Sequence, residues 1–180
     1  MYELKKEETN EQTKITEIVG SVGKFVYSLI ETILVALVLA IVLYLFIMTP
    51  HEVVGSSMHP TYKNGEFLMA NKITYKFSEP QRGDVIIFKY SDTQDFIKRI
   101  IGVPGDEVMI KDGKIYINGS MLDESDYLDS SVITNGGSYI HEGQSIILSS
   151  NEYFVCGDNR TNSSDSREFG AIEMAQIDRE

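Results

Sequence analysis

Two neighbouring stretches, DVIIFKY at residues 84–90 and FIKRII at residues 96–101, decide the fold of this chain. Both are rich in β-branched and aromatic residues, which favour strands, and a short polar segment separates them. Turn signals follow at Pro104-Gly105, Asp112-Gly113 and Asn118-Gly119. We therefore expect antiparallel strands joined by short hairpins.

Further strand patterns extend the sheet toward the C-terminus, at KIYI (residues 114–117), SIIL (residues 145–148) and YFVC (residues 153–156). Residues 120–143 lie between them and are polar and rich in Ser, Asp and Gly, which predicts a surface insertion. No long amphipathic helix is visible in this region. The fold predicted for residues 50–180 is an all-β antiparallel domain of coiled or barrel-like sheets.

The segment at residues 25–48 is apolar except for Glu31. As a helix it would reach about 36 Å, which exceeds the hydrocarbon thickness of about 30 Å. A cleaved secretory signal fits poorly, because the apolar run is long, the segment before it is extended, and no A-x-A site follows. We predict an uncleaved single-pass transmembrane anchor at residues 25–48.

The distribution of lysines predicts the orientation of this anchor. Four lysines precede it, and the twenty residues after it hold only Lys63. The positive-inside rule then makes residues 1–24 a cytoplasmic tail, expected to have little structure of its own, and residues 50–180 an external domain. This external part carries 12 basic and 21 acidic residues, a formal net charge of −9.

Composition excludes several classes of function. The net charge of −11 and the lack of a Lys/Arg cluster argue against a nucleic-acid partner. Cys156 is the only cysteine, so no intramolecular disulfide is available, and His51, His59 and His141 form no metal-binding motif. We expect neither a metal nor a cofactor, and nothing in the sequence indicates an oligomeric state.

Ser56 and Ser57 follow the anchor closely, and a serine hydroxyl needs an adjacent base to become a strong nucleophile. On the strand at residues 96–101, Lys98 shares an apolar face with its neighbours two positions away, and Arg99 lies on the other face. Arginine stays protonated, whereas a desolvated lysine can lose its proton. The alternatives are a polar linker at the serines and a lysine that reaches out to solvent.

A third polar segment, GDNRTNSSDSR at residues 157–167, combines turn formers with two aspartates and two arginines. Asx turns and Asp–Arg pairs would make it a rigid loop that can support a site. On residue types alone it could equally bind calcium or phosphate, although its acidic spacing does not match an EF-hand.

Four segments together resemble the conserved boxes of bacterial type I signal peptidases, in the order and spacing of that family, in a minimal, Gram-positive-like form. They are GSSMHPT (residues 55–61), RGDV (residues 82–85), KRIIGVPGD (residues 98–106) and GDNRTNSSDSREFG (residues 157–170).

The resemblance implies roles for particular residues. The serine directly before Met58, Ser57 rather than Ser56, would be the nucleophile, and Lys98 the general base. Several relatives carry a hydroxyl two residues before the nucleophile, where this chain has Gly55. The oxyanion would then depend on backbone N–H groups, chiefly that of Ser57.

The same resemblance assigns supporting roles in the third polar segment. Asp165 and Arg167 would pair to support the site, and Ser163 would hydrogen-bond near the lysine amine.

The function implied is that of a membrane-bound serine endopeptidase that removes signal peptides from secreted pre-proteins through an acyl-enzyme, with the catalytic domain outside the cell membrane. Its partners would be pre-protein signal peptides and the lipid bilayer. Two alternatives are a Ser-His-Asp hydrolase that uses His141 or His59, and an anchored, non-catalytic β module in which Ser57 and Lys98 serve only the structure.

Overall fold

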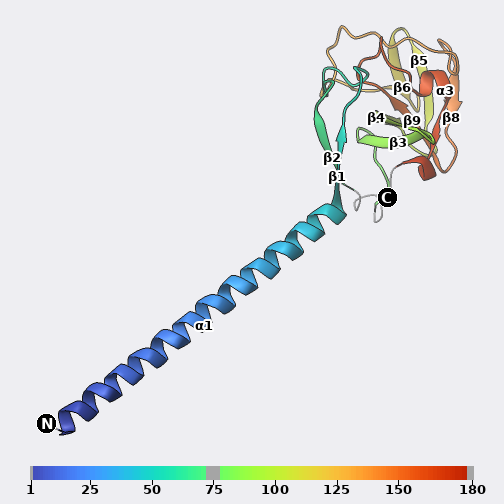
Figure 1. The fold of residues 1–180 in the computed structure, drawn as a ribbon. Helices are drawn as coiled ribbons and strands as arrows, with labels where there is room; N and C mark the ends of the chain where they lie inside the picture. The colour runs from blue at the N-terminus through green and yellow to red at the C-terminus, as the bar shows by residue number, and fades with distance from the viewer. Residues whose placement is uncertain (1, 72–77, 178–180) are drawn as a thin grey trace. The chain divides into compact units, whose positions relative to one another are not determined.

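The computed structural model describes the backbone of residues 2–71 and 78–177, and the side chains of residues 19–44, 50–70 and 78–177. The chain divides into two compact units at residues 47 and 48. A single helix, α1 (Tyr2–Ile47), forms the first unit, and the regular structure of the second unit consists mainly of short antiparallel strands (Figure 1).

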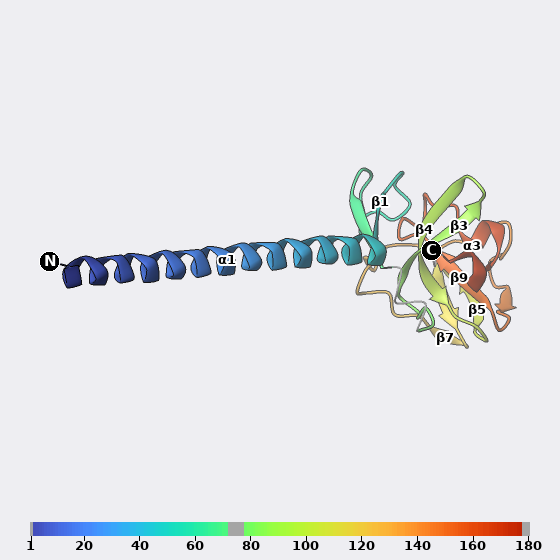
Figure 2. The same cartoon turned by 60° about the horizontal axis from the view of Figure 1, so that its bottom comes forward.

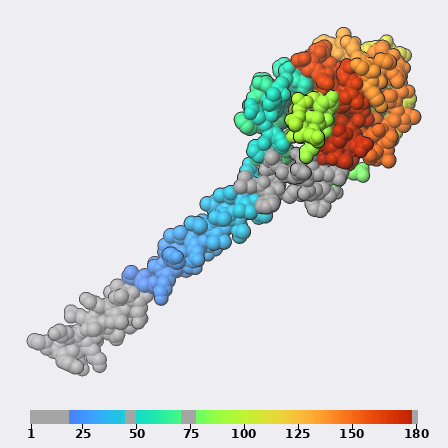
Figure 3. All heavy atoms as spheres, turned by 45° about the vertical axis from the view of Figure 1, so that its right-hand side comes forward, coloured from blue at the N-terminus to red at the C-terminus, as the bar shows by residue number. Residues whose placement is uncertain are grey.

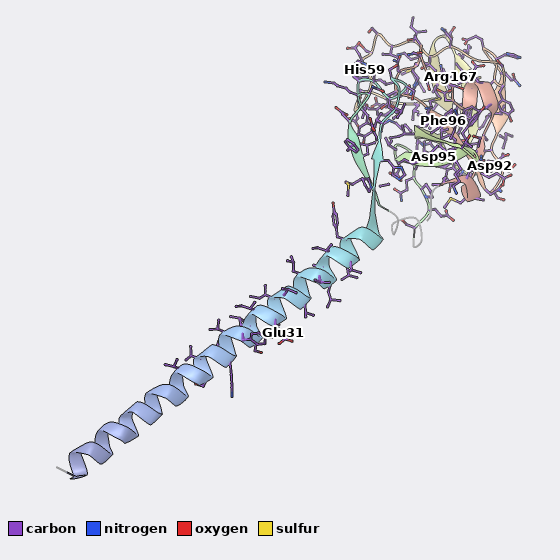
Figure 4. All side chains as sticks on the ribbon, in the orientation of Figure 1. Glu31, His59, Asp92, Asp95, Phe96 and Arg167 are labelled. Carbon is purple, nitrogen blue, oxygen red and sulfur yellow. The ribbon has the colours of Figure 1, made fainter. Side chains whose placement is uncertain are left out.

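The part of α1 at Val19–Tyr44 is long and apolar enough to cross a membrane, with a mean hydropathy of 2.6. All of its side chains are exposed, and Glu31 projects from it (Figure 4). The helix also runs through residues 2–24, which we expected to have little structure. Lys and Glu are abundant there and have high helix propensity, and no Gly or Pro precedes Gly20.

Within the described residues of the second unit, the strands form three antiparallel sheets (Figures 1 and 2). The first pairs β1 (Met48–Glu52) with β2 (Phe67–Asn71). The second has the order β10 (Ile172–Glu173), β9 (Glu152–Cys156), β4 (Gln94–Gly102), β3 (Val85–Ser91). The third has the order β7 (Ser120–Met121), β6 (Lys114–Ile117), β5 (Glu107–Lys111), β8 (Ser145–Ile147). Two short helices, α3 (Ser166–Phe169) and η1 (Met174–Gln176), are present in the part of the chain described after β9. The predicted all-β antiparallel fold with one N-terminal apolar helix is confirmed.

The predicted hairpins follow from residues that tolerate positive φ. Asp112 and Gly113 join β5 to β6 with φ of 52° and 73°, and Asn118 and Gly119 join β6 to β7 with φ of 53° and 79°. Positive φ at both central residues defines the tight turn whose twist matches that of paired strands.

Strand β9 explains why the second sheet is buried on both faces. Tyr153 and Val155 pack into one hydrophobic cluster, whereas Phe154 and Cys156 pack into another. Because side chains alternate along a strand, these clusters lie on opposite faces of the sheet. The central strands of this sheet therefore form a rigid frame for any side chain they carry.

Strand β4 is paired along only part of one edge. It pairs with β3 from Gln94 to Arg99, but with β9 only from Arg99 onward. The N–H and C=O of Ile100 bond to the β3 side. By alternation, the backbone groups of Asp95 and Ile97 face the opposite edge, where no described strand pairs with them.

Residues 120–143, predicted to be a surface insertion, are mostly exposed, but three of them also contribute to the interior. Thr134 and Ile140 are 2% and 0% exposed, and Leu128 is also buried. The prediction from local polarity describes the exposed positions, but it did not include these buried residues, whose partners lie in distant parts of the chain.

Candidate active site

Ser57 and Lys98 meet although 41 residues separate them. Ser57 lies in a turn after β1, in which the buried side chain of Met58 is 1% exposed, and Lys98 lies on β4. The Lys98 Nζ donates hydrogen bonds of 2.9 Å to Ser57 Oγ and to the carbonyl of Ile97. A serine hydroxyl and an amine in direct contact are the two components of a nucleophile and its base.

Lys98 is buried, at 3% exposed, and its amine lies 4.9 Å from the centre of the Phe96 ring. Phe96 and Ile100 pack in one cluster, which agrees with the apolar face predicted for this strand. Burial lowers the pKa of Lys98 to about 8, and the negative charge of Asp165 opposes this shift. Desolvation is the larger effect, so the neutral amine becomes accessible near physiological pH.

Asn159 fixes the turn that carries Ser57. Its backbone N–H donates to the Ser57 carbonyl at 2.9 Å, and its side-chain amide donates to the Ser56 carbonyl at 3.0 Å. Gly157 lies against this turn so closely that a Cβ there would collide with the Ser57 carbonyl and with Ser163 Oγ. Only glycine allows the loop and the turn to approach this far.

Asp165 and Arg167 form a buried, bidentate pair with two N–O distances of 2.8 Å. Asp165 caps the N-terminus of α3 by accepting from the Arg167 N–H, and it also accepts from the Gly157 N–H at 3.0 Å. The pair thus connects α3 to the loop beside Ser57. Two charges buried together need this kind of geometry to offset desolvation.

Arg99 forms a second bidentate pair, with Asp158, at 2.8 and 2.7 Å. Thr61, four residues after Ser57, donates its hydroxyl proton to the same carboxylate. Asp158 therefore links β4 to the nucleophile turn. The sequence singled out Asp–Arg pairing in this loop, but it did not identify Arg99 or Thr61 as partners, because they are distant in the chain.

The segment at residues 120–143 contributes a third buried pair. Arg160 bonds through its guanidinium to Glu124 and Thr134, and through Nε to the Gly157 carbonyl at 3.0 Å. The Tyr127 hydroxyl donates to Glu124, and the Tyr127 ring lies 4.0 Å from the Arg99 guanidinium carbon. Burial and the nearby Glu124 raise the pKa of Tyr127. No sequence motif indicated this support.

One implied contact is not formed. Ser163 Oγ is buried and makes no hydrogen bond to any described residue, because the Lys98 amine bonds to Ser57 and Ile97 instead. His59 and His141 are exposed, and neither forms a hydrogen bond with Ser57 among the described residues. The Ser57 N–H likewise donates to no described group, so it is available to an oxyanion.

Ser57 and Lys98 both line a cleft of about 440 Å³. One wall comes from β1 and β2 and the other from β3 and β4, and the turn and the loop at residues 157–167 complete it. Figure 3 shows the green β3–β4 region between the teal segment at residues 50–70 and the red C-terminal segment. Phe96 and Asp95 lie on β4 (Figure 4).

The family model described as "Signal peptidase, peptidase S26" matches residues 26–179. Over 159 residues the chain is 38% identical to signal peptidase IB of Staphylococcus aureus, an alignment that covers 82% of this chain and 83% of that protein. It is 36% identical over 154 residues to a probable signal peptidase I-2 of Synechocystis sp., covering 82% and 67% respectively. A crystal structure of signal peptidase I from Enterococcus faecalis aligns with a TM-score of 0.45 and 33% identity, over 56% of this chain and 94% of that chain.

Proposed function

The chain belongs to the signal peptidase family, peptidase S26, and we propose that it removes signal peptides from secreted pre-proteins with Ser57 as nucleophile and Lys98 as general base. Membership of this family makes it a serine endopeptidase. The observation that carries the assignment of the dyad is the 2.9 Å hydrogen bond from the buried Lys98 amine to Ser57 Oγ.

The lowered pKa of Lys98 supports its role as a base. With a pKa of about 8, roughly one lysine in ten is neutral at pH 7, whereas an ordinary lysine is neutral in about one case in 2,500. The neutral amine accepts the Ser57 hydroxyl proton while the serine oxygen attacks the scissile carbonyl carbon. The Ser57 N–H is available to donate to the oxyanion that forms.

The second half of the reaction returns both residues to their starting state. The Lys98 ammonium gives its proton to the leaving amine, which departs as the new N-terminus and leaves an acyl ester on Ser57. Lys98 then accepts a proton from water, whose oxygen attacks the ester carbonyl. When the ester bond breaks, Ser57 recovers a proton from Lys98.

The unpaired edge of β4 supports binding of an extended substrate. The backbone groups of Asp95 and Ile97 face this edge, and both residues line the cleft that contains the dyad. An extended peptide placed there would add a strand to the sheet, with its backbone held next to Lys98. The recognition would depend on the substrate backbone as well as on its side chains.

We further propose that α1 anchors the enzyme in the cell membrane, with residues 50–180 outside. The length and hydropathy of Val19–Tyr44 and the four lysines near the N-terminus support this orientation. A signal peptide lies in the same membrane with its cleavage site near the external surface, so anchoring would concentrate enzyme and substrate together.

The decisive experiment compares Ser57→Ala with Ser56→Ala in cleavage of a purified pre-protein. We expect Ser57→Ala to abolish processing while the protein remains folded and membrane-bound, and Ser56→Ala to retain substantial activity. Ser56 is the matched control because it occupies the same turn but is not bonded to Lys98. An active Ser57→Ala enzyme beside an inactive Ser56→Ala enzyme would refute the assignment.

A further inference from the structure

The lining of the cleft changes its chemical character between two parts of the domain. One part of the lining comes from β1 to β4 and from the segment just after β1, and it is largely apolar. We call this part the apolar wall. Its apolar residues are Val53, Val54, Leu68, Ile87, Phe96 and Ile97, and its polar residues include His51, Glu52 and Asp95. The nucleophile turn and the loop at residues 157–167 contribute Ser56, Asn162 and Ser164, which are all polar. The Lys98–Ser57 hydrogen bond joins these two parts, because Lys98 belongs to β4 and Ser57 to the turn.

The polar residues retain unused hydrogen-bonding groups. Asn162 donates one amide proton to Ser56 Oγ at 2.8 Å. No described group bonds to the Asn162 side-chain carbonyl, to its second amide proton or to the Ser164 hydroxyl, and both residues are exposed in the cleft. The two side chains therefore offer both donors and an acceptor to a bound molecule.

The loop that carries these groups is held rigidly relative to Ser57. Asn159 bonds to the carbonyls of Ser56 and Ser57, and Arg160 bonds to Gly157 and to buried partners on the other side. Asp165 fixes the same loop through the Gly157 N–H. Free polar groups on a fixed support bind with little loss of conformational entropy.

We propose that Asn162 and Ser164 form a subsite for the first residues of the mature chain, on the leaving-group side of the scissile bond. This inference rests on the proposed function, in which the substrate has two unlike halves. The signal-peptide half contains the apolar segment, which suits the apolar wall. The mature half has a different sequence in every pre-protein, so the feature common to all substrates is the peptide backbone, and hydrogen-bond donors and acceptors recognise backbone.

Two peptide substrates with the same signal-peptide half isolate this subsite. The long substrate carries six residues after the scissile bond, and the short substrate carries a single residue amide. The full-length enzyme in detergent micelles cleaves both, and the measured quantity is the ratio of kcat/KM for the long substrate to that for the short one. Because the same enzyme sample is used for both, the ratio does not depend on the fraction that is folded.

We expect the wild-type enzyme to prefer the long substrate, and Asn162→Ala to reduce that preference about two- to ten-fold, the effect of one or two hydrogen bonds. Ser164→Ala provides a second, independent variant with the same expected direction. Thr161→Ala is the control from the same loop, because Thr161 does not line the cleft, and it should keep the wild-type ratio.

Equal losses on the two substrates would mean that Asn162 acts only by holding the nucleophile turn, and would overturn the subsite. A wild-type enzyme with no preference for the long substrate would overturn it as well. If the wild-type enzyme cleaved neither substrate nor a full pre-protein, the proposed function itself would be wrong, and that result differs from both of the others.

Discussion

Lys98 and Arg99 are adjacent on β4 and both are buried, but their charged groups have different hydrogen-bond partners. Arg99 has a bidentate carboxylate partner in Asp158. Lys98 bonds to a hydroxyl and a backbone carbonyl, and it has no carboxylate within hydrogen-bond distance among the described residues. A buried cation with a paired carboxylate stays charged, whereas one without such a partner is destabilised in its charged form. In the proposed mechanism, Lys98 therefore differs from Arg99 in two ways: its amine can lose a proton, and it has no carboxylate partner within hydrogen-bond distance among the described residues.

Replacing Lys98 with arginine tests this distinction. We expect Lys98→Arg to lose nearly all cleavage of pre-protein, because a guanidinium keeps the positive charge but cannot accept the Ser57 proton at any physiological pH. Single-turnover cleavage by the folded variant measures the effect.

The histidines provide the controls for that substitution. His51 lines the cleft, whereas His59 and His141 do not, and alanine variants of all three should keep most of the rate. A near wild-type rate for Lys98→Arg, or complete loss of activity in a folded histidine variant, would exclude the Ser57–Lys98 dyad.

The pH dependence of kcat/KM should report the pKa of Lys98 in the free enzyme. The active form is the neutral amine, so kcat/KM should rise about tenfold per pH unit below a pKa of about 8 and level off above it. A substrate without groups that titrate between pH 6 and 10 keeps the profile interpretable. An acid limb centred at or above pH 10 would show that burial does not shift this lysine, and one near pH 6 would indicate a histidine.

At the scale of elements, the strands and turns that depend on neighbouring residues could be predicted from the sequence. The patterns at residues 84–90 and 96–101 predicted β3 and β4, and the Asp-Gly and Asn-Gly pairs predicted two hairpin turns. Strand β1 (Met48–Glu52) was missed because Pro50 lies at its centre and its sequence, MTPHE, has no run of β-branched or aromatic residues.

Supporting residues of the site were harder to predict, because their partners are remote in the chain. Asp165 and Arg167 are two positions apart, and their pairing was predicted on the resemblance. Glu124 and Arg160 are 36 positions apart, and Glu124 lies in a segment whose composition resembles a loop. The buried contacts of residues 120–143 could not be predicted from the sequence, because they form only when the fold brings that segment against the loop at residues 157–167.

The Glu124–Arg160 pair should stabilise the domain because it is buried. Removing one partner from a buried pair leaves an uncompensated charge, so we expect Arg160→Met to reduce the free energy of unfolding by about 3 kcal/mol. Urea unfolding of the full-length protein in micelles, followed by near-UV circular dichroism of its tyrosines, measures this. The double variant Glu124→Leu/Arg160→Met should recover part of the loss, since neither charge is then left alone.

A more exposed pair provides the comparison for that experiment. Arg82 pairs with Asp106, but the Arg82 side chain is 31% exposed, compared with 0% for Arg160. Arg82→Met should cost about 1 kcal/mol or less, because solvent screens the attraction of the partly exposed guanidinium and Asp106 keeps hydrogen bonds from the Val103 N–H and the Asn118 side chain. If Arg160→Met costs no more than Arg82→Met, the third buried pair does not support the site.

At the scale of the whole molecule, charge is unevenly distributed along the chain. The apolar part of α1 contains Glu31 near its middle, and all described side chains from Val19 to Tyr44 are exposed. Residues 1–24 contain four lysines and five glutamates, whereas residues 50–180 carry a formal net charge of −9. An anionic domain is repelled by anionic lipid headgroups, so the membrane attachment proposed above would depend on burial of apolar helix surface rather than on charge.

The orientation of the chain can be tested by labelling introduced cysteines, because the single native cysteine is buried and should not react with the label. Cys156 is 0% exposed, so it should not react with a membrane-impermeant maleimide while the domain is folded. Ser120→Cys places a thiol at an exposed position of the domain, and Thr9→Cys places one before the apolar helix. If four lysines hold the N-terminus in the cytoplasm, Ser120→Cys reacts in intact protoplasts and Thr9→Cys reacts only after permeabilisation. The reverse pattern would place residues 50–180 inside the cell, where a peptidase for translocated pre-proteins could not reach its cleavage sites.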